Sequence, residues 1–337
     1  MSATLRIGVI GVGRIGLSHA AAVKAQPAVS QLLVADADTA RAEAAAARLG
    51  AVAVSVGDLI SQADGVVIAT STSTHADLLL AAAAARRPVF CEKPVALDIP
   101  TTRAVLAQVK ASGVPVQIGF QRRFDAGYQA ARAAVRSGTL GELRRAHLLT
   151  CDAAPPPAEF IPGSGGLFKD CGIHDIDALR WVLGREVTET TAYGAARGAG
   201  FFAAAGDVSE AAGLLRLDDG TLATLQLSRY NGQGYDVRME IAGVSGSIAV
   251  GLDAHTALRS AEPGVVFPDG KAHLAFYPRF EAAYRAELAA FIDVAAGLTA
   301  SPASVEDALE ALYVCEALRL SCAEGRPVAV DEVRRDF

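Results

Sequence analysis

The first 120 residues alternate short runs of apolar residues with longer, alanine-rich stretches. Nearly every position in the short runs is apolar, which is typical of strands that are buried on both faces of a parallel sheet. The longer stretches favour helix, because alanine has the highest helix propensity. We predict strands over residues 5–10, 31–35, 52–55, 65–69, 88–91 and 115–119, and helices over residues 15–25, 39–49, 75–86 and 99–112. This alternation indicates a doubly wound α/β domain.

After residue 123 the pattern changes to a helical segment followed by several runs with strand character. The turn signals Asp218-Asp219-Gly220 and Val244-Ser245-Gly246 separate some of these runs, which suggests antiparallel meanders. We predict strands over residues 142–151, 186–195, 210–217, 222–227, 236–242 and 247–250, and helices over residues 126–137, 173–183, 278–297 and 305–324. The expected architecture is a Rossmann-type α/β domain over residues 1–122 and an α+β domain with a large, mainly antiparallel open sheet over residues 123–337.

Composition and charge narrow the possible classes of protein. A length of 337 residues suits two domains, and a hydrophobic share of 51% excludes a chain that is disordered throughout. The net charge of −6 gives no reason to expect a nucleic-acid partner, and no run approaches the ~20 apolar residues of a membrane span. The N-terminus lacks the features of a signal peptide, and the five scattered cysteines argue against a disulfide framework and a zinc site. We therefore expect a cytoplasmic, reduced protein with no membrane or nucleic-acid partner and no metal.

Gly11, Gly13 and Gly16 form a G-x-G-x-x-G motif between the first predicted strand and the first predicted helix. In this context the first glycine allows the tight turn, the second lets the backbone approach a pyrophosphate, and the third lets helix and strand pack closely. Asp36 follows the second strand, where a carboxylate can bind the ribose hydroxyls of the adenosine and would repel a 2′-phosphate. The motif therefore predicts NAD rather than NADP as the cofactor. A glycine turn without a ligand is the alternative interpretation.

The triplet Glu92-Lys93-Pro94 directly follows the predicted strand over residues 88–91. Ligands of doubly wound sheets lie at the carboxyl ends of the strands, so Lys93 is expected beside the nicotinamide if the glycine loop holds the pyrophosphate. Its ammonium group could donate a hydrogen bond to a reacting hydroxyl, and desolvation would lower the pKa of the lysine toward the working range. The alternative is an ordinary surface lysine at a strand end.

The segment from Gly163 to Asp177 combines a glycine-rich loop with the start of a predicted helix. Asp170 and His174 are four residues apart, so they share one face of a helix, and Asp177 lies three residues further along, near that face. A histidine beside carboxylates suits general base catalysis, because its reference pKa is about 6.5. A metal site is weakly supported, since no second histidine lies nearby. A helix cap and a solvated helix face form the alternative interpretation.

Together these motifs resemble the Gfo/Idh/MocA family of sugar and cyclitol dehydrogenases. The order and spacing of Glu-Lys-Pro and Asp-x-x-x-His-Asp make the set specific. The matching segments run from the start of the chain past its midpoint and comprise residues 11–16, Asp36, residues 70–75, 92–94, 119–125 and 165–177. Within the family the chain is most similar to inositol 2-dehydrogenases, on the strength of residues 119–125, Asp152 with the prolines after it, residues 166–170, residues 173–177 and Gly234-Tyr235-Asp236.

The resemblance implies NAD-dependent oxidation of a secondary hydroxyl of a cyclitol to the ketone by hydride transfer. It assigns His174 as general base, Lys93 as the group that polarises or holds the reacting oxygen, and Asp170 as the group that orients the histidine or binds the neighbouring hydroxyl. The implied cofactor-binding residues are Gly11, Gly13, Arg14, Ile15, Gly16, Asp36, Ala37, Arg41, Thr70, Ser71, Thr72, His75, Glu92, Lys93 and Gln121. The implied substrate-binding residues are Lys93, Arg122, Asp152, Asp170, His174, Asp177 and Tyr235. The second domain would bind the polyol or sugar and form a homodimer or homotetramer through its sheet.

Two positions depart from the inositol dehydrogenase pattern. Cys151-Asp152-Ala153 stands where Arg-Asp-Pro is usual, and Gln121 stands where methionine is expected. Both fall in the expected substrate wall, which leaves open a pyranose, a glycoside oxidised at C3 or an aminocyclitol as the substrate. Arg14 and Arg41 could also admit NADP, and His19 is expected to be structural. Two other classes stay open, an NAD-binding sensor without catalysis and a lyase or glycosidase with a retained NAD, and NADH formation from a polyol would exclude the sensor.

Overall fold

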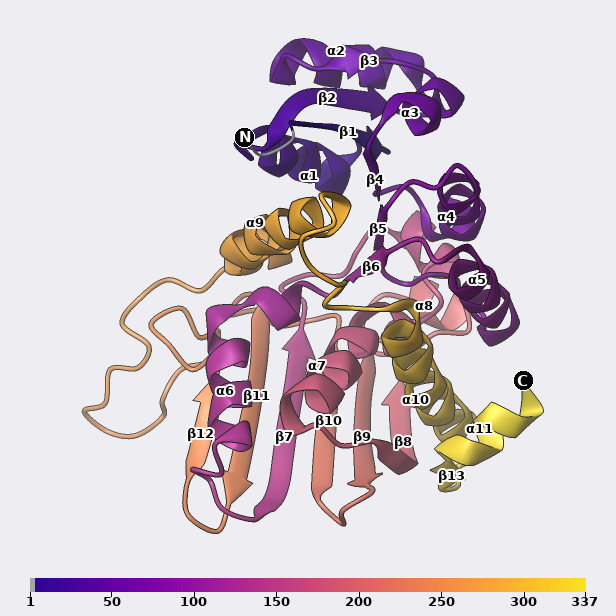
Figure 1. The fold of residues 1–337 in the computed structure, drawn as a ribbon. Helices are drawn as coiled ribbons and strands as arrows, with labels where there is room; N and C mark the ends of the chain where they lie inside the picture. Colours follow the sequence, from indigo (N-terminus) through magenta and orange to yellow (C-terminus); the bar gives the residue numbers. More distant parts are fainter. Residues whose placement is uncertain (1–3) are drawn as a thin grey trace. The chain divides into compact units, whose positions relative to one another are not determined.

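The computed structural model describes residues 4–337, which form two compact units (Figure 1). The first unit comprises the residues up to 124 together with residues 282–309. The second unit comprises residues 125–281 together with residues 310–337. Each unit is built around one sheet, six-stranded in the first and seven-stranded in the second.

The sheet of the first unit is the predicted parallel one, so the doubly wound fold class is confirmed. Its strands lie in the order β3-β2-β1-β4-β5-β6, and all neighbours pair parallel. The order reverses between β1 and β4, which is the switch point beside which ligands bind in such sheets. The strands are β1 (Leu5–Ile10), β2 (Val29–Ala35), β3 (Val52–Ala53), β4 (Gly65–Ile68), β5 (Val89–Glu92) and β6 (Val116–Gly119).

Helices cover both faces of this sheet (Figure 1). On one face, α1, α2 and α9 pack their apolar side chains with Ile7 and Val9 in one buried cluster, to which α9 contributes Leu288, Phe291 and Ile292. On the other face lie α3, α4 and α5. The helices are α1 (Arg14–Lys24), α2 (Thr39–Leu49), α3 (Val56–Gln62), α4 (His75–Ala84), α5 (Ile99–Ser112) and α9 (Phe276–Ala295). Helix α3 was not predicted, because a seven-residue segment is too short to show helical periodicity.

The second unit has a mainly antiparallel sheet, as predicted, in the order β12-β11-β7-β10-β9-β8-β13. The expected meanders account for β8-β9-β10 and for β11-β12. They do not account for β7 and β10, which pair parallel with Ser228 opposite Cys151. The strands are β7 (Leu143–Cys151), β8 (Val187–Ala195), β9 (Glu210–Leu217), β10 (Leu222–Ser228), β11 (Asp236–Gly243), β12 (Ser247–Val250) and β13 (Val328–Ala329).

Helices α6, α7 and α10 cover one face of the second sheet, and Figure 1 shows α6 and α7 in front of it. A Cβ on Gly213 of β9 would lie 2.9 Å from the Leu318 side chain of α10, which identifies the covered face. Alternate residues point the other way, and there Tyr193 and Leu214 are 72% and 49% exposed. The helices are α6 (Ala126–Arg136), α7 (Ile173–Leu183), α8 (Phe201–Ala204), α10 (Val305–Glu324) and α11 (Val330–Asp336). The short elements α8, β13 and α11 were not predicted.

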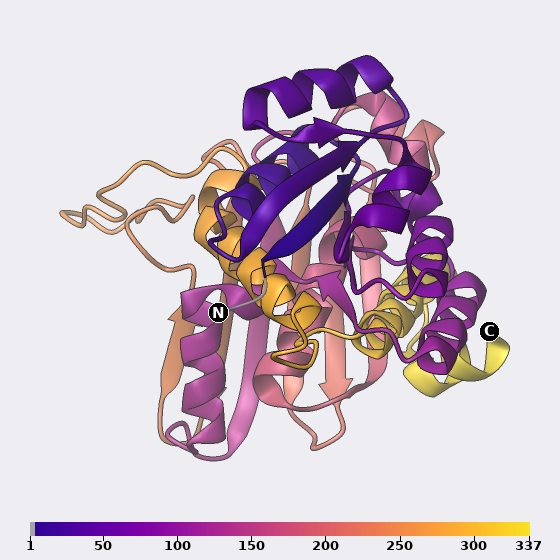
Figure 2. The ribbon, with the colours of Figure 1, turned by 45° about the horizontal axis from the view of Figure 1, so that its top comes forward.

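The loop over residues 251–275 follows β12 and projects from the second sheet as an extended arm (Figure 1, Figure 2). The rings of His255 and His273 lie 4.8 Å apart within it. Burial lowers the pKa of His273, and the nearby His255 and Arg279 lower it further. Among residues 4–337, no helix combines the length and the apolar composition that crossing a membrane requires.

Candidate active site

The glycine motif forms the turn between β1 and α1 and leaves room for a phosphate group. Gly11 has a φ of +87°, and a Cβ on it would lie 2.7 Å from the carbonyl oxygen of Ala69. A Cβ on Gly16 would lie 1.9 Å from the carbonyl oxygen of Gly11, so the helix and the loop are in direct contact. Gly13 differs, because a Cβ there would meet no atom of the described residues within 4 Å. The space beside Gly13 is therefore open, as close approach of a pyrophosphate requires.

The amino end of α1 is suited to bind an anion in that space. Gly13 is the N-cap residue, no side chain among residues 4–337 caps the helix, and the first turn carries no acidic residue. The partial positive charge of the helix end is thus not neutralised by a neighbouring carboxylate of the first turn. Arg14, which is exposed, and Ile15, which is half-buried, occupy this turn.

Asp36 directly follows β2 and holds the glycine loop in place. Its Oδ2 accepts a hydrogen bond from Val12 N at 2.9 Å, and its Oδ1 accepts from Asp38 N at 3.0 Å and from Arg41 Nη1 at 3.2 Å. A carboxylate can accept about four hydrogen bonds, so Asp36 retains capacity for a ribose hydroxyl. Ala37 and the Arg41 side chain are exposed beside it, and Arg41 is the cation that a 2′-phosphate would meet.

His75 links the segment after β4 to the loop after β5. Its Nδ1 lies 2.8 Å from the carbonyl oxygen of Pro94, its Nε2 lies 3.1 Å from that of Thr70, and the residue is buried. Carbonyl oxygens only accept hydrogen bonds and a neutral imidazole has one N–H donor, so the tautomer decides which of the two carbonyls His75 binds. Both ring nitrogens nevertheless lie within hydrogen-bond distance of the backbone of the two loops. Ser71, which is exposed, and Thr72, which is half-buried, follow Thr70 in the same turn.

The Glu92-Lys93-Pro94 segment lies at the carboxyl end of β5, and its Lys93–Pro94 peptide bond is cis. Glu92 Oε1 lies 2.6 Å from Nε2 of His19, a buried residue of α1. Glu92 also lies against Gly119 of β6, where a Cβ would come within 2.9 Å of Glu92 Oε2. Lys93 is half-buried and follows this anchored carboxylate directly.

Gln121, Arg122 and Arg123 are buried in the short turn after β6. Arg123 Nη1 lies 3.2 Å from Asp307 Oδ2, and although burial acts to raise the pKa of Asp307, this cation and hydrogen bonds from Ser304 hold it below its usual range. No group among residues 4–337 donates to the buried Oε1 of Gln121. Leaving a buried acceptor unsatisfied costs about 1–3 kcal/mol, so this oxygen suits an amide donor such as the carboxamide of a nicotinamide. Gln121, the space at Gly13 and the uncapped α1 all fit a nicotinamide dinucleotide.

In the second unit, Asp170 lies in a π-helical turn (Phe168–Gly172) that continues directly into α7. Such turns are rare and often occur at functional sites. Lys169 Nζ lies 2.8 Å from Glu316 Oε2 of α10, and both side chains are largely buried. This ion pair attaches the turn, and with it Asp170, to α10.

The first two turns of α7 carry the other predicted residues of this segment. His174 is half-buried and Asp177 is buried. Asp175, between them, is also buried and accepts hydrogen bonds from Thr150 Oγ1 of β7 at 2.8 and 3.0 Å. Asp175, which the sequence analysis did not select, therefore anchors the helix to the sheet.

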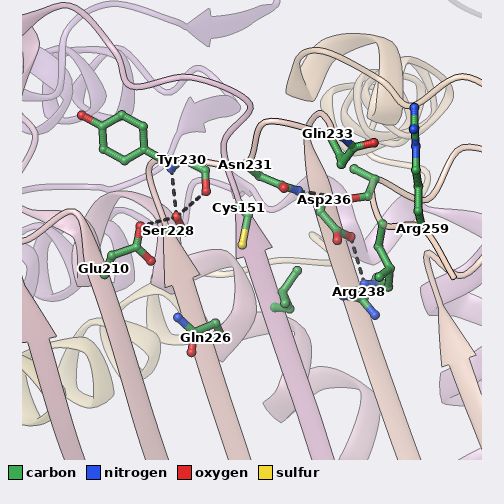
Figure 3. Close-up of a pocket in the computed structure, with 13 residues that line it drawn as sticks. Cys151, Glu210, Gln226, Ser228, Tyr230, Asn231, Gln233, Asp236, Arg238 and Arg259 are labelled. Atoms are coloured by element: carbon green, nitrogen blue, oxygen red, sulfur yellow. Dashed lines mark hydrogen bonds and ion pairs between the residues drawn. The ribbon is translucent and has the colours of Figure 1, made fainter. Parts of the chain in front are cut away.

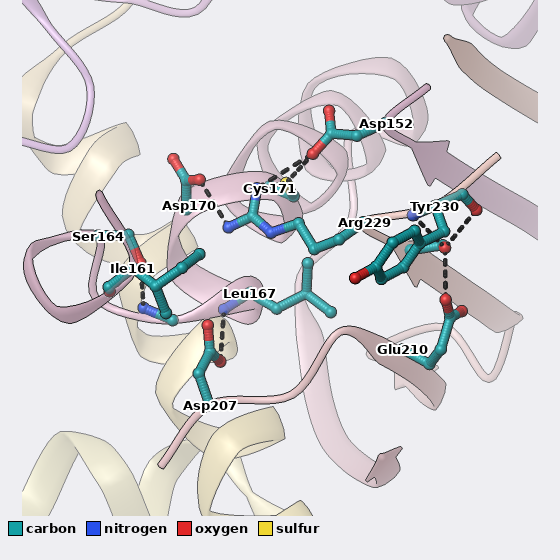
Figure 4. Close-up of polar contacts among 12 residues, drawn as sticks. Asp152, Ile161, Ser164, Leu167, Asp170, Cys171, Asp207, Glu210, Arg229 and Tyr230 are labelled. Carbon is teal, nitrogen blue, oxygen red and sulfur yellow. Dashed lines mark hydrogen bonds and ion pairs between the residues drawn. The ribbon is translucent and has the colours of Figure 1, made fainter. Parts of the chain in front are cut away.

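A buried arginine that the sequence analysis missed lies at the centre of a polar cluster in the second unit (Figure 4). Arg229 Nη1 lies 3.1 Å from Asp152 Oδ2 and 3.0 Å from Cys171 Sγ, and its Nη2 lies 2.8 Å from Asp170 Oδ2. Burial acts to lower the pKa of Arg229, but the neighbouring Cys171, Asp170 and Asp152 outweigh it and raise the pKa. The structure thus brings Asp152 and Asp170, two predicted site residues, to one cation.

A cavity of about 430 Å³ lies in the second unit (Figure 3). Its lining includes Cys151, Glu210, Ser228, Asp236 and Arg238, and it includes neither Asp170 nor His174 among the described residues. Burial, with the carboxylates of Asp236 and Glu210 among the further causes, raises the pKa of Cys151 to about 12.

Cys151 lies on the opposite face of the second sheet from the neighbouring Thr150 and from the predicted site residue Asp152. Side chains alternate along a strand, so Cys151 points to the face opposite to Thr150 and Asp152. Thr150 bonds α7, and Asp152 bonds Arg229, whereas Cys151 lines the cavity. The departure at Cys151 therefore lies outside the cluster of Asp152 and Asp170. Tyr235, the last predicted substrate residue, is largely buried, and its backbone N–H donates to the carbonyl of His273 at 2.7 Å.

The part of the chain that the structure describes does not bring together a set of metal ligands. Residues 4–337 contain no group of three or more His, Cys, Asp or Glu side chains that could hold a metal ion. All five cysteines are free thiols.

Comparison with known proteins gives similarity along nearly the whole chain. Residues 5–120 match a family described as the oxidoreductase family with an NAD-binding Rossmann fold, and residues 128–249 match the GFO/IDH/MocA C-terminal domain. The chain is 37% identical to a myo-inositol dehydrogenase of Streptomyces leeuwenhoekii, over 96% of this chain and 100% of that protein. It is 35% identical to a scyllo-inositol 2-dehydrogenase (NAD(+)) of Bacillus subtilis, over 99% and 98%. The solved structure of scyllo-inositol dehydrogenase from Lactobacillus casei with bound NAD(H) and scyllo-inositol has a TM-score of 0.88 at 28% identity, covering 97% of this chain and 99% of that one.

Proposed function

Because the chain belongs to the Gfo/Idh/MocA family of NAD-binding oxidoreductases, we propose that it oxidises a secondary hydroxyl of an inositol-type cyclitol to the ketone. The observation that carries the proposal is the coincidence of two features. The full-length relatives at 35% and 37% identity are inositol dehydrogenases, and Lys93, Asp170 and His174 are all present in this chain. A protein that only senses NAD would have no need of this trio.

We assign the chemistry to these three side chains on the family resemblance. His174 accepts the proton of the reacting hydroxyl, Lys93 donates a hydrogen bond to the same oxygen, and Asp170 binds the neighbouring hydroxyl or orients His174. As the proton leaves, the C–H bond of that carbon breaks with its electron pair and the carbonyl forms. When bound, NAD supplies the acceptor for this hydride at its nicotinamide ring.

Residues of the first unit would hold the cofactor. The amide groups at the amino end of α1 would bind the pyrophosphate beside Gly13, and Asp36 would accept hydrogen bonds from the adenosine ribose. The buried Oε1 of Gln121 would accept from the nicotinamide carboxamide. Glu92 and His75 would keep the loops that carry Lys93 and Thr70 in place through the contacts described above.

Residues of the second unit would recognise the polyol. Carboxylates accept hydrogen bonds from hydroxyl groups, so Asp152 and Asp177 are assigned to substrate hydroxyls. Tyr235 of this unit and Arg122 of the first unit are assigned to the same role by resemblance alone.

We also propose that copies of the chain associate as a homodimer or homotetramer through the exposed face of the seven-stranded sheet. Tyr193, Leu214 and Leu222 are exposed there, with Tyr193 at 72%. Exposed apolar side chains that gather on one flat face are typical of an interaction surface.

A substrate screen tests the proposed reaction. Purified enzyme with NAD, or with NADP, is incubated with myo-, scyllo- and chiro-inositol, common hexoses, glycosides and aminocyclitols, and NADH or NADPH absorbance is followed. We expect NAD-linked turnover with an inositol. Turnover confined to hexoses, glycosides or aminocyclitols would contradict the cyclitol assignment, and no turnover with NAD binding intact would contradict the dehydrogenase assignment.

The assignment of the base is tested with His174→Ala. We expect kcat to fall by roughly 10²–10⁴-fold, the usual contribution of a general base, with little change in NAD affinity. His255→Ala, which replaces an exposed histidine of the loop arm, is the matched control and should keep kcat. An unchanged kcat in His174→Ala would refute the assignment.

A further inference from the structure

Arg229 is a buried cation that neither the sequence motifs nor the assigned chemistry uses. Its side chain is 3% exposed, and its guanidinium contacts Asp152, Asp170 and Cys171 (Figure 4). Burying a charge costs free energy unless the charge is paired and hydrogen-bonded. The groups that pair with a buried arginine therefore matter for the folded structure. Here those groups include Asp152 and Asp170, two of the three second-unit carboxylates to which the proposed function gives a role at the substrate.

The sheet topology explains why the three side chains meet. Strands β7 and β10 run parallel with Cys151 opposite Ser228, so both strands end at the same edge of the sheet. Asp152 follows β7, Arg229 follows β10, and the backbone N–H of Asp152 donates to the carbonyl of Ser228 at 2.9 Å. The backbone N–H of Arg229 donates to Ser209 at 2.8 Å, which fixes the other side. Backbone hydrogen bonds therefore position Asp152 and Arg229 independently of the contacts that their side chains make.

Asp170 reaches the same guanidinium from the π-helical turn. It is the third charged residue of the cluster, and its Oδ2 binds Nη2, whereas Asp152 Oδ2 binds Nη1. Two carboxylates this close to one point repel each other, and a cation between them removes that repulsion. Because the guanidinium is planar and rigid, it also fixes the direction in which each carboxylate presents its oxygens.

We propose that Arg229 is a positioning residue for substrate recognition, which holds the carboxylates of Asp152 and Asp170 in place so that they accept hydrogen bonds from hydroxyls of the polyol. This inference rests on the proposed function. Arg229 acts through the two aspartates and makes no contact with the reacting atoms. A misplacement of about 1 Å in such groups can lower turnover by roughly 10²-fold.

The first test compares Arg229→Met, Arg229→Lys and the wild type with the best substrate of the screen. We expect kcat/KM for the polyol to fall by roughly 10²-fold in Arg229→Met, with a higher KM, and by less in Arg229→Lys, which keeps the charge without the fork. The Kd for NAD should not change. Arg180→Met is the control, since Arg180 is a buried arginine of the same unit that binds Glu186 at 2.6 and 2.8 Å. It should lose thermal stability and keep its KM.

The second test separates positioning from a purely structural role. In an Asp152→Asn background, Arg229→Met should cost less in kcat/KM than in the wild type, because coupled residues are not additive. Methylguanidinium added to Arg229→Ala should restore part of the activity. The proposal would be overturned if the losses of kcat/KM in the two single variants were additive and methylguanidinium restored no activity. It would also be overturned if Arg229→Met and Arg229→Lys lost kcat/KM equally, each in proportion to its fall in Tm.

The failure of this inference is distinguishable from the failure of the proposed function. A wild-type enzyme that oxidises no polyol or sugar refutes the proposed function and this inference with it. A wild-type enzyme that is active, together with Arg229→Met at full kcat/KM, refutes this inference alone.

Discussion

Glu92 and His19 form a buried contact of 2.6 Å that joins the carboxyl end of β5 to α1. The ring of His19 packs against the rings of Phe90 and Tyr284, with distances of 5.6 Å and 5.7 Å between ring centroids. These contacts fix the position of His19 from several sides. One end of this contact precedes Lys93 and the other lies on the helix that the glycine motif opens. The pair therefore connects the segment assigned to catalysis with the segment assigned to the pyrophosphate.

Replacing His19 by phenylalanine keeps the aromatic packing and removes the partner of Glu92. We expect the free energy of unfolding to fall by about 1–3 kcal/mol, the usual cost of leaving a buried polar group unsatisfied, and the Kd for NAD to rise. Urea denaturation and calorimetric titration with NAD measure the two effects. Glu92→Gln, which keeps a hydrogen-bonding group, should lose less, and a variant with wild-type stability and NAD affinity would contradict this role for His19.

Two glycines of one motif should respond to alanine in opposite ways. A Cβ on Gly13 points into open space, so Gly13→Ala should fold with a wild-type Tm and bind NAD at least about tenfold more weakly, which corresponds to about 1.4 kcal/mol. A Cβ on Gly16 would lie 1.9 Å from a carbonyl oxygen, so Gly16→Ala should lower the Tm before any ligand is added. Thermal melts with and without NAD distinguish the cases. Equal NAD affinity in Gly13→Ala and the wild type would place the pyrophosphate elsewhere.

Asp36 and Arg41 together should set the preference between NAD and NADP. Asp36→Ser removes the negative charge that opposes a 2′-phosphate and releases Arg41 from its 3.2 Å contact. We expect the ratio of kcat/KM for NADP to that for NAD to rise at least about tenfold, and the double variant Asp36→Ser with Arg41→Ala to lose most of that gain. Steady-state kinetics with both cofactors is the measurement. A ratio that stays at the wild-type value would show that other residues select the cofactor.

The ion pair between Lys169 and Glu316 should make stability depend on pH in the acid range. Burial acts to raise the pKa of Glu316, but hydrogen bonds from Arg319 and Lys169 lower it below its ordinary 4.5. A carboxyl with a lowered pKa in the folded state stabilises above its unfolded value, and this contribution disappears as the pH falls through the folded value. Lys169→Met should therefore be about 1–3 kcal/mol less stable than the wild type at neutral pH.

The difference between Lys169→Met and the wild type should shrink as the pH falls below 4.5, where Glu316 takes up a proton in both proteins. Urea denaturation over a pH series gives the comparison. Lys110→Met, which breaks an exposed pair with Glu306, is the control and should change stability by less than about 1 kcal/mol. A difference that does not vary with pH would show that Lys169 acts through packing alone.

The exposed face of the second sheet should carry the contacts between copies of the chain. Leu214→Glu combined with Tyr193→Glu places two charges on that face, on the neighbouring strands β9 and β8, and we expect the oligomer to dissociate in sedimentation experiments. Val266→Glu changes an 84% exposed residue of the loop arm and should leave the mass unchanged. A wild-type protein that sediments as a monomer would refute the association itself.

The sequence predicted best what depends on neighbouring residues. The strand over residues 5–10 and the helices over residues 39–49, 99–112 and 305–324 have the predicted bounds. The side chains of Asp38 and Asp98 cap two of these helices, so residues adjacent in the sequence determine where each of the two begins. The glycine motif was predictable for the same reason, since strand, turn and helix are contiguous there.

The parts that were missed depend on residues far apart in the chain. Arg229 follows a segment with an ordinary strand pattern. Nothing near it in the sequence shows that β10 pairs parallel with β7, which brings Arg229 into contact with Asp152. The residues of the π-helical turn that carries Asp170 are of types that also occur in α-helical turns, so the sequence does not distinguish the two. A signal was available in hindsight, because a charged residue directly follows each of the two strands.

The contribution of α9 to the first unit has a consequence for synthesis on the ribosome. Leu288, Phe291 and Ile292 complete an apolar cluster whose other members are mostly encoded before residue 91. At about 5–20 residues per second, the ribosome needs roughly 8–30 s to pass from the end of the first segment of this unit, at residue 124, to residue 282. During that interval the nascent Rossmann sheet exposes the apolar surface that α9 will cover. The emerging chain should therefore be a chaperone client until the helix leaves the exit tunnel, and expression of residues 1–124 alone should yield an aggregating fragment.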